Sequence, residues 1–118
     1  MQFFIYFTMT EGAPMNPPTP EGMAKMGALM EKAFKDGIIV STGQLPRQTT
    51  HIKLEAGEYS VTDGPFIEGK EVIPGYTVID VPSKEEALAW AKELRACMGD
   101  GVLKMAQLNA YSQDHIKK

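Results

Sequence analysis

The segment between positions 61 and 76 holds the residues best suited to acid–base chemistry, Asp63, Lys70 and Tyr76. A carboxylate in an apolar pocket can act as a general acid or base, because burial disfavours its charged form. A lysine can hold an anionic group or an enolate. We therefore predict Asp63 as a catalytic residue and Lys70 and Tyr76 as substrate-binding residues. Lys70 and Glu71 could instead form a surface ion pair, and Tyr76 could be a half-buried strand residue.

A tight turn after Asp63 would position these side chains. Gly64 can adopt a positive φ, Pro65 fixes the next φ, and Asp63 can accept bonds from nearby backbone amides. With Phe66 and Tyr76 as walls, the segment would line a pocket beside a sheet, so Gly64, Pro65 and Phe66 join the predicted binding residues. Two other interpretations stay open: a rigid loop at the end of a hairpin, or a dimer contact.

The histidines and the single cysteine offer less chemistry. His51 is expected on the outward side of a strand and His115 in a polar tail, and the sequence has no pair of histidines with a carboxylate at metal-ligand spacing. Cys97 falls near a helix C-terminus, where the helix dipole disfavours a thiolate. As the only cysteine it excludes an intrachain disulfide and fits a reducing compartment. We expect no metal, no other cofactor and a cytoplasmic location.

Size and charge narrow the class of protein. The chain has 118 residues and a formal net charge of −3, which predicts one domain over residues 1–118. Lysines and arginines are scattered among acids, which argues against a nucleic-acid partner. The apolar runs are far shorter than the ~20 residues of a spanning helix, and the N-terminus lacks the features of a signal peptide. We expect no membrane association.

The first half of the chain predicts strand, helix and strand. Residues 2–9 are aromatic and β-branched, as in a buried strand. A helix is predicted from Pro20 to about Asp36, with Thr19 as its N-cap and Gly37 after its end. Residues 38–42 favour a second strand that Gly43 ends or kinks. The helix has apolar residues at spacings of three and four, which are Met23, Met26, Met30, Ala33 and Phe34.

The second half predicts a hairpin and then strand, helix and strand. Residues 51–55 and 59–62 alternate around the turn Ala56-Gly57, with Ile52 and Leu54 on one face of the first hairpin strand. A strand over 75–81 is followed by a helix with a capping box at Ser83 and Glu86, and a last strand covers 102–108. The buried stripe of this helix is predicted to be Ala87, Leu88, Trp90, Ala91 and Leu94.

This element order predicts an α+β, ferredoxin-like fold. Two right-handed βαβ units, separated by the hairpin, place both helices on one face of an antiparallel sheet. The strand over 2–9 nevertheless has apolar side chains on both faces: Phe3, Ile5 and Phe7 on one, Phe4 and Tyr6 on the other. A sheet covered by helices on one face only therefore needs a second cover. We predict a homodimer packed sheet to sheet.

The same residues carry a family resemblance. One segment resembles the DGPF branch of the YCII-related family: it has Asp63-Gly64-Pro65-Phe66, then Lys70-Glu71, then Gly75-Tyr76 at the start of a strand. The first strand, the second helix and Ser41-Thr42-Gly43 resemble their counterparts in that branch. The resemblance spans most of the chain and implies a dimeric α+β barrel. The YciI-like branch has a histidine in its first helix, paired with an aspartate. Here Met23 and Met26 occupy that helix face, so histidine chemistry is not expected.

Two classes of function follow. By analogy with related folds, the first is a cofactor-independent enzyme of the lyase, isomerase or oxygenase kind, acting on a small aromatic or lactone-like molecule. The second is a non-catalytic module that binds a small ligand or a protein. Since proteins of the DGPF branch are often found alongside extracytoplasmic-function sigma factors in bacteria, the resemblance implies that such a module could be regulatory. A structural dimer without a ligand is a third possibility.

Overall fold

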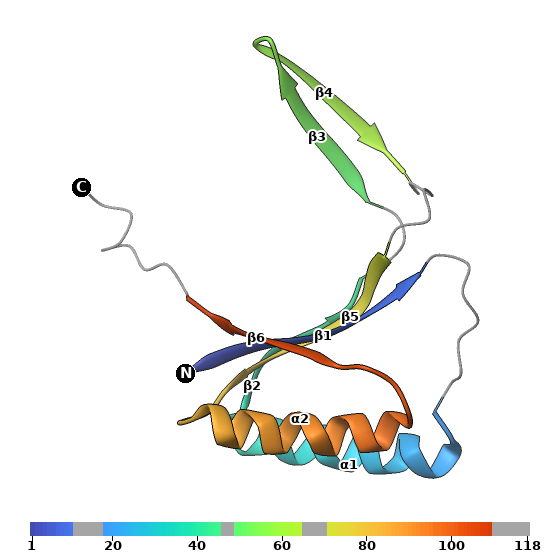
Figure 1. Cartoon of the computed structure of the whole chain (residues 1–118), viewed down its shortest axis with the longest axis vertical. Helices are drawn as coiled ribbons and strands as arrows, with labels where there is room; N and C mark the ends of the chain where they lie inside the picture. The colour runs from blue at the N-terminus through green and yellow to red at the C-terminus, as the bar shows by residue number, and fades with distance from the viewer. Residues whose placement is uncertain (11–17, 46–48, 65–70, 110–118) are drawn as a thin grey trace.

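The computed structural model describes residues 1–10, 18–45, 49–64 and 71–109 (Figure 1). Two helices and four strands form the body of the molecule, and two further strands form a separate hairpin. In chain order the elements are β1 (Gln2–Thr10), α1 (Pro20–Lys35), β2 (Ile39–Gln44), β3 (Thr50–Glu55), β4 (Glu58–Asp63), β5 (Glu71–Asp80), α2 (Lys84–Met98) and β6 (Lys104–Leu108).

The four-stranded sheet has the strand order β2-β5-β1-β6. Every neighbouring pair is antiparallel, and both helices cover the same face of the sheet (Figure 1). Without the hairpin, this is the order of a ferredoxin-like fold, so the predicted fold class is confirmed. We call the sheet face turned away from the helices the outer face.

Strand alternation places the hydrophobic core between the sheet and the helices. Phe3 and Ile5 of β1 and Ile79 of β5 are the largest fully buried side chains. Phe3 is paired with Ile79 and Ile5 with Thr77, so these side chains share one face. The helices complete the core with Ala33, Ala87, Trp90, Ala91 and Leu94.

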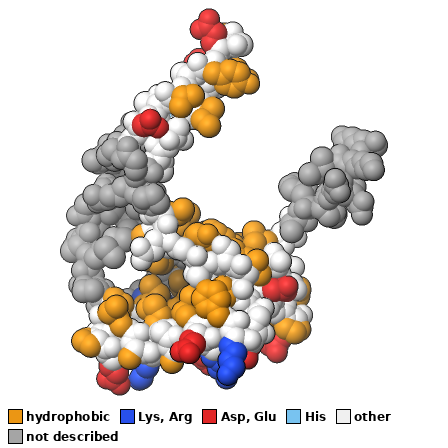
Figure 2. Space-filling model, turned by 180° about the vertical axis from the view of Figure 1, so that it is seen from behind, with side chains coloured by type: hydrophobic (Ala, Val, Ile, Leu, Met, Phe, Trp, Pro, Cys, Tyr) orange, Lys and Arg blue, Asp and Glu red, His pale blue; other side chains and the backbone are white. Residues whose placement is uncertain are grey.

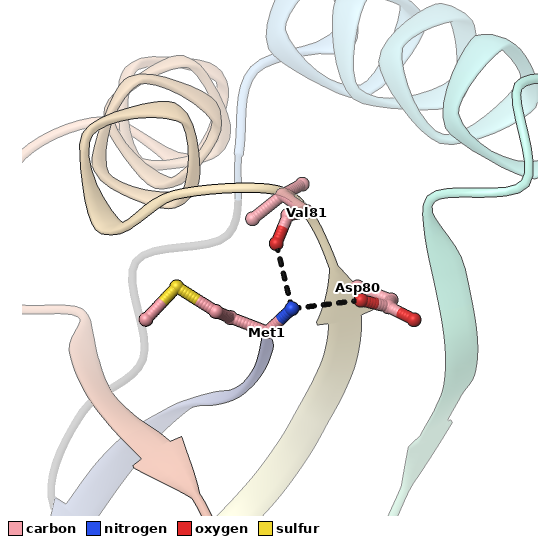
Figure 3. Close-up of polar contacts among 3 residues, drawn as sticks. All are labelled: Met1, Asp80 and Val81. Atoms are coloured by element: carbon pink, nitrogen blue, oxygen red, sulfur yellow. Dashed lines mark hydrogen bonds and ion pairs between the residues drawn. The ribbon is translucent and has the colours of Figure 1, made fainter.

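The start of β1 is fastened to the end of β5 (Figure 3). The amino group of Met1 donates to the carbonyl oxygen of Val81 at 2.9 Å and contacts a carboxylate oxygen of Asp80 at 3.2 Å. The amide of Val81 donates in return to the carbonyl oxygen of Met1. These bonds hold the two central strands in register at the end of the sheet where the chain turns into α2.

β5 is longer than the sequence predicts and contains Pro74, although proline cannot donate to a strand ladder. The sequence predicts a start at Gly75, whereas β5 begins at Glu71. In the structure the pairing shifts between Phe7 and Met9 of β1, which leaves an extra residue in β5. Proline is tolerated at such a β-bulge. The carbonyl oxygen of Pro74 also accepts a bond from the amide of Leu45, so β5 remains tied to the end of β2.

The helix ends are confirmed, but part of each predicted apolar stripe is wrong. The hydroxyls of Thr19 and Ser83 accept bonds from the backbone amides of Gly22 and Glu86, as predicted for N-caps. Met23, Phe34 and Leu88 are exposed because they lie at the edge of the face that each helix turns to the sheet. The partly buried residues of α1 that pack on the core are Met26, Leu29 and Met30.

The hairpin of β3 and β4, which we call the arm, forms a separate two-stranded sheet. The predicted turn at Ala56-Gly57 is confirmed, with φ of 51° and 79°. The arm rises from the body on the side opposite the helices (Figure 1). Every residue of both strands is exposed.

Candidate functional site

Tyr76 lies in an aromatic cluster on the outer face. Its ring stacks on Phe4 with centroids 5.8 Å apart and an interplanar angle of 20°. The ring of Phe4 also contacts Tyr6, with centroids 5.1 Å apart. The alternation of β1 and β5 places all three half-buried rings on the same face. The outer face therefore presents a continuous aromatic surface.

Two residues of the edge strand β2 hold the ring of Tyr76. The Tyr76 hydroxyl shares a hydrogen bond of 3.0 Å with the hydroxyl of Ser41. Gly43 is paired with Tyr76, and a Cβ atom there would lie 3.3 Å from the tyrosine ring. Gly43, which the sequence predicted to end or kink the strand, is instead followed by a further paired residue of β2. It leaves room for the tyrosine ring.

Hydroxyl bonds on the opposite face fix β2 against β5. The hydroxyl of Thr42 donates to the carbonyl oxygen of Tyr76 at 3.0 Å and lies 2.9 Å from the hydroxyl of Thr77. Since Thr42 has one hydroxyl hydrogen, Thr77 is the donor in the second bond. Thr77 is buried, so these bonds hold the backbone that carries Tyr76 from the protected side of the sheet.

Asp63 and Gly64 lie at the base of the arm. The hydroxyl of Thr50 donates to a carboxylate oxygen of Asp63 at 2.6 Å, and the amide of Gly64 donates to the carbonyl oxygen of Thr49 at 2.8 Å. Gly64 is buried, whereas Asp63 is exposed. Asp63 is thus oriented by a short hydrogen bond at the end of β4.

The structure does not bring all the predicted site residues together. Asp63 belongs to the two-stranded sheet and Tyr76 to the four-stranded sheet, and within the described ranges no hydrogen bond or ring contact joins them. Pro65, Phe66 and Lys70 lie outside the described residues.

The sequence prediction assigned no role to Ser41 or Phe4. Both are found only by combining strand alternation with the pairing of β2, β5 and β1. Residues 41 and 43 share a face in β2, and this face becomes the outer face once Gly43 is paired with Tyr76. The relevant sequence signal is a small residue and a hydroxyl at alternate positions of one strand.

A cavity of about 330 Å³ opens on the helix side of the molecule, between α1 and α2. Trp90 lines it at the base, and charged side chains of both helices, including Lys32 and Glu86, contribute to its wall. The indole nitrogen of Trp90 is buried and has no hydrogen-bond partner in the described part of the chain. Of the predicted site residues that the structure describes, Asp63, Gly64 and Tyr76, none lines this cavity.

Within the described residues, no group of three histidine, cysteine or acidic side chains could hold a metal ion. No helix in that part of the chain is long and apolar enough to cross a membrane.

Fold and surface together define a ferredoxin-like α+β protein with an aromatic outer sheet face and a projecting arm. Residues 1–109 match the YCII-related domain, and the chain belongs to the YCII-related family. It is also 36% identical over 74 residues to "Uncharacterized protein R00369" of Rhizobium meliloti (strain 1021). That match covers 61% of this chain and 60% of the relative's length.

Proposed function

We propose that this chain is a DGPF-branch member that acts as a homodimer, with a site for a small aromatic or lactone-like molecule beside the sheet. The Asp63-Gly64-Pro65-Phe66 motif supports the branch. The half-buried apolar side chains on the outer face support a sheet-to-sheet dimer, because helices cover only the other face. The single Cys97 supports a reducing cytoplasm as its location.

The observation that carries the ligand proposal is the aromatic cluster with its hydroxyl pair. The rings of Phe4, Tyr6 and Tyr76 offer a surface on which a planar molecule can stack. The hydroxyls of Tyr76 and Ser41 have two hydrogens between them, and their mutual bond uses one. The other can be donated to a carbonyl or carboxylate oxygen of the ligand. A small molecule with a ring and an oxygen acceptor therefore fits this surface.

In the catalytic form of this proposal, Asp63 is the acid–base group. Its carboxylate would take a proton from a carbon next to a carbonyl group and return it elsewhere on the substrate, which isomerises the substrate without a cofactor. Lys70 would hold the anionic oxygen that develops. Gly64 and Pro65 would shape the turn, and Phe66 would form an apolar wall.

Native mass spectrometry of the purified protein is the first test. A dimer carrying a few hundred extra daltons would contain a retained ligand, and its identification would give the substrate class. A panel of small aromatic acids and lactones is then screened by ligand-observed NMR for binding and turnover. Tyr76→Phe should weaken binding several-fold, since one hydrogen bond contributes about 1 kcal/mol. Ser60→Ala removes a hydroxyl from the polar face of the arm and serves as the control.

Asp63→Asn separates catalysis from binding. An enzyme should lose turnover and keep ligand affinity, whereas the control Asp36→Asn, at the C-cap of α1, should keep both. Binding without turnover in the wild type would exclude the catalytic form. Absence of binding from the whole panel, with an empty dimer, would contradict the ligand proposal.

A regulatory binding module is the second candidate, and the exposed arm is the observation that favours it. The exposed side chains of the arm include four large apolar ones, Ile52, Leu54, Tyr59 and Val61, and exposed apolar patches commonly mark interaction sites. Under this candidate the partner would be a protein such as an extracytoplasmic-function sigma factor. Ligand binding without turnover, together with a direct complex between purified proteins, would support it.

A further inference from the structure

The two faces of the arm differ in chemistry although both are exposed. Cross-strand pairs place Ile52 opposite Val61 and Leu54 opposite Tyr59. Their side chains remain 59–73% exposed. The alternate pairs form the other face, which is polar: His51 with Thr62 and Lys53 with Ser60. We call the first set the apolar strip of the arm.

A two-stranded hairpin with such a strip needs a cover. An isolated hairpin is at best marginally stable in water, and packing on one face is what usually stabilises it. The described part of this chain provides no such packing, because every residue of β3 and β4 is exposed. The polar face is suited to water, whereas the strip is suited to another protein surface.

The position of the arm identifies a second copy of this chain as the cover. The arm is inserted between β2 and β5, which are neighbours in the sheet, and it rises on the side of the outer face (Figure 1). Figure 2 shows hydrophobic side chains gathered along the side of the arm that overlooks the body. A copy seated on the outer face would therefore lie beside the strip. Two-fold symmetry would then place the partner's arm beside this chain in the same way.

Asp63 shares the face of the apolar strip. The strip ends in the pair Thr50–Asp63, two residues from Ile52 and Val61 along the two strands. The Asp63 carboxylate is exposed in the single chain and is held by the Thr50 hydroxyl. A partner that covers the strip would also remove water from around this carboxylate. The apolar pocket that acid–base chemistry at Asp63 requires would then be built by two copies.

We propose that the apolar strip of the arm packs against a second copy of this chain, and that the partner completes the site around Asp63. The inference rests on the proposed homodimer and goes beyond it, because two sheets could pack together while both arms stay free in water. Arm docking and sheet docking must therefore be measured separately.

Adjacent substitutions in β4 provide a matched pair for arm docking. Val61→Asp places a charge in the apolar strip, whereas Ser60→Asp places the same charge on the polar face. We expect Val61→Asp to weaken the dimer at least about tenfold in sedimentation equilibrium, because an unpaired charge would be buried. Ser60→Asp should leave the dissociation constant unchanged. Val61→Thr, which keeps the shape, should weaken the dimer less.

The environment of Asp63 is measured by labelling carboxyl groups with a carbodiimide and an amine, followed by mass spectrometry. In the dimer, Asp63 should be labelled several-fold more slowly than in the Val61→Asp variant. Glu58, on the polar face near the turn, is the internal control and should be labelled at the same rate in both. The fluorescence of Trp90, the only tryptophan, checks that the body is folded in each variant.

The possible results distinguish the two proposals. A dimer weakened by Val61→Asp alone, with Asp63 protected, supports arm docking. A wild-type dimer that tolerates Val61→Asp, with Asp63 fully labelled, overturns arm docking and leaves the sheet dimer intact. Val78→Asp places a charge on the outer face. If this variant loses the dimer while Val61→Asp keeps it, arm docking is likewise overturned and the sheet dimer stands. A wild-type monomer at all concentrations overturns both proposals.

Discussion

The body sheet and the arm are both antiparallel and alternating, yet among the described residues only the body sheet is covered. Ile79 of β5 is 0% exposed because the helices pack on it, whereas Ile52 of β3 is 72% exposed. Burying such a side chain contributes roughly 1.5–3 kcal/mol. The same strand pattern therefore stabilises the body, whereas in the described part of the chain it leaves the apolar strip of the arm exposed. Alternation alone indicates which face is to be buried, and it does not identify what buries it.

The largest expected contrast comes from shortening one isoleucine in each region. Ile79→Ala should lower the free energy of unfolding by about 2–5 kcal/mol, since it removes packed atoms and leaves a cavity. Ile52→Ala should change it by less than about 0.5 kcal/mol at concentrations where the chain is monomeric. Urea unfolding followed by Trp90 fluorescence measures both. Equal losses in the two variants would mean that the arm is packed within its own chain.

Two glycines of α1 differ in the same way: one lies against α2 and the other has no described neighbour. A Cβ at Gly22 would meet the backbone oxygen of Cys97 in α2, so Gly22→Ala should push the helices apart and destabilise the body by about 1–3 kcal/mol. A Cβ at Gly27 meets no described atom within 4 Å, and Gly27→Ala should stabilise the helix by about 1 kcal/mol.

Thermal unfolding of the two variants gives the sign of each effect directly. We expect Gly22→Ala to lower the midpoint temperature and Gly27→Ala to raise it, although both are the same substitution in the same helix. A stabilised Gly22→Ala would show that the close approach of α1 and α2 is not a feature of the protein in solution.

Hydroxyl pairs give a smaller contrast between the sheet and the arm. The bond between Tyr76 and Ser41 is half-buried, so Ser41→Ala should cost the body about 0.5–1.5 kcal/mol. The bond between Thr50 and Asp63 is exposed, and Thr50→Val should leave the unfolding of the body within about 0.5 kcal/mol of the wild type.

A double-mutant cycle on Ser41→Ala and Tyr76→Phe tests whether the loss of stability comes from the hydrogen bond between these two hydroxyls. The two losses should add to more than the loss in the double variant. Additive losses would show that the two hydroxyls are bonded to water instead of to each other.

Local signals in the sequence were sufficient for the elements and their order. Thr19 and Ser83 predicted the helix starts, and Ala56-Gly57 predicted the hairpin turn. The errors arose where a distant residue decides the outcome. Pro74 is tolerated in β5 because the register with β1 shifts there, and this shift is not visible in β5 alone.

The candidate site was less predictable than the fold. Tyr76 was chosen for its chemistry, but its partners Ser41 and Phe4 come from strands far away in the sequence. Their proximity depends on the pairing of β5 with both β2 and β1. Under the proposed arm docking, the environment of Asp63 depends on the partner, which the pattern of a single chain does not specify. The proposed roles of Lys70 and Phe66 remain predictions from the sequence.

The smallest expected effect concerns the turn of the arm and isolates its own stability from that of any partner. Ala56 has φ of 51°, in the left-handed region, where a residue with a Cβ is strained by about 1 kcal/mol. Asparagine tolerates this conformation, and Asn-Gly is a favoured pair for such hairpin turns. Ala56→Asn should therefore slow hydrogen exchange of the amides in β3 and β4 by up to about fivefold, under conditions where the chain is monomeric.

The amides of β1 should not respond to Ala56→Asn, and Ala56→Val should speed exchange in the arm because a β-branched residue resists positive φ. Unchanged exchange in both variants would show that turn strain does not limit the stability of the arm. If the turn responds as expected but the arm amides still exchange far faster than those of β1, a better turn alone does not stabilise the arm, which is the result expected if its stability depends on a surface packed on the apolar strip. The exchange rates of the arm amides in monomeric Ala56→Asn would then be the reference for measuring how far dimer formation slows exchange in the arm.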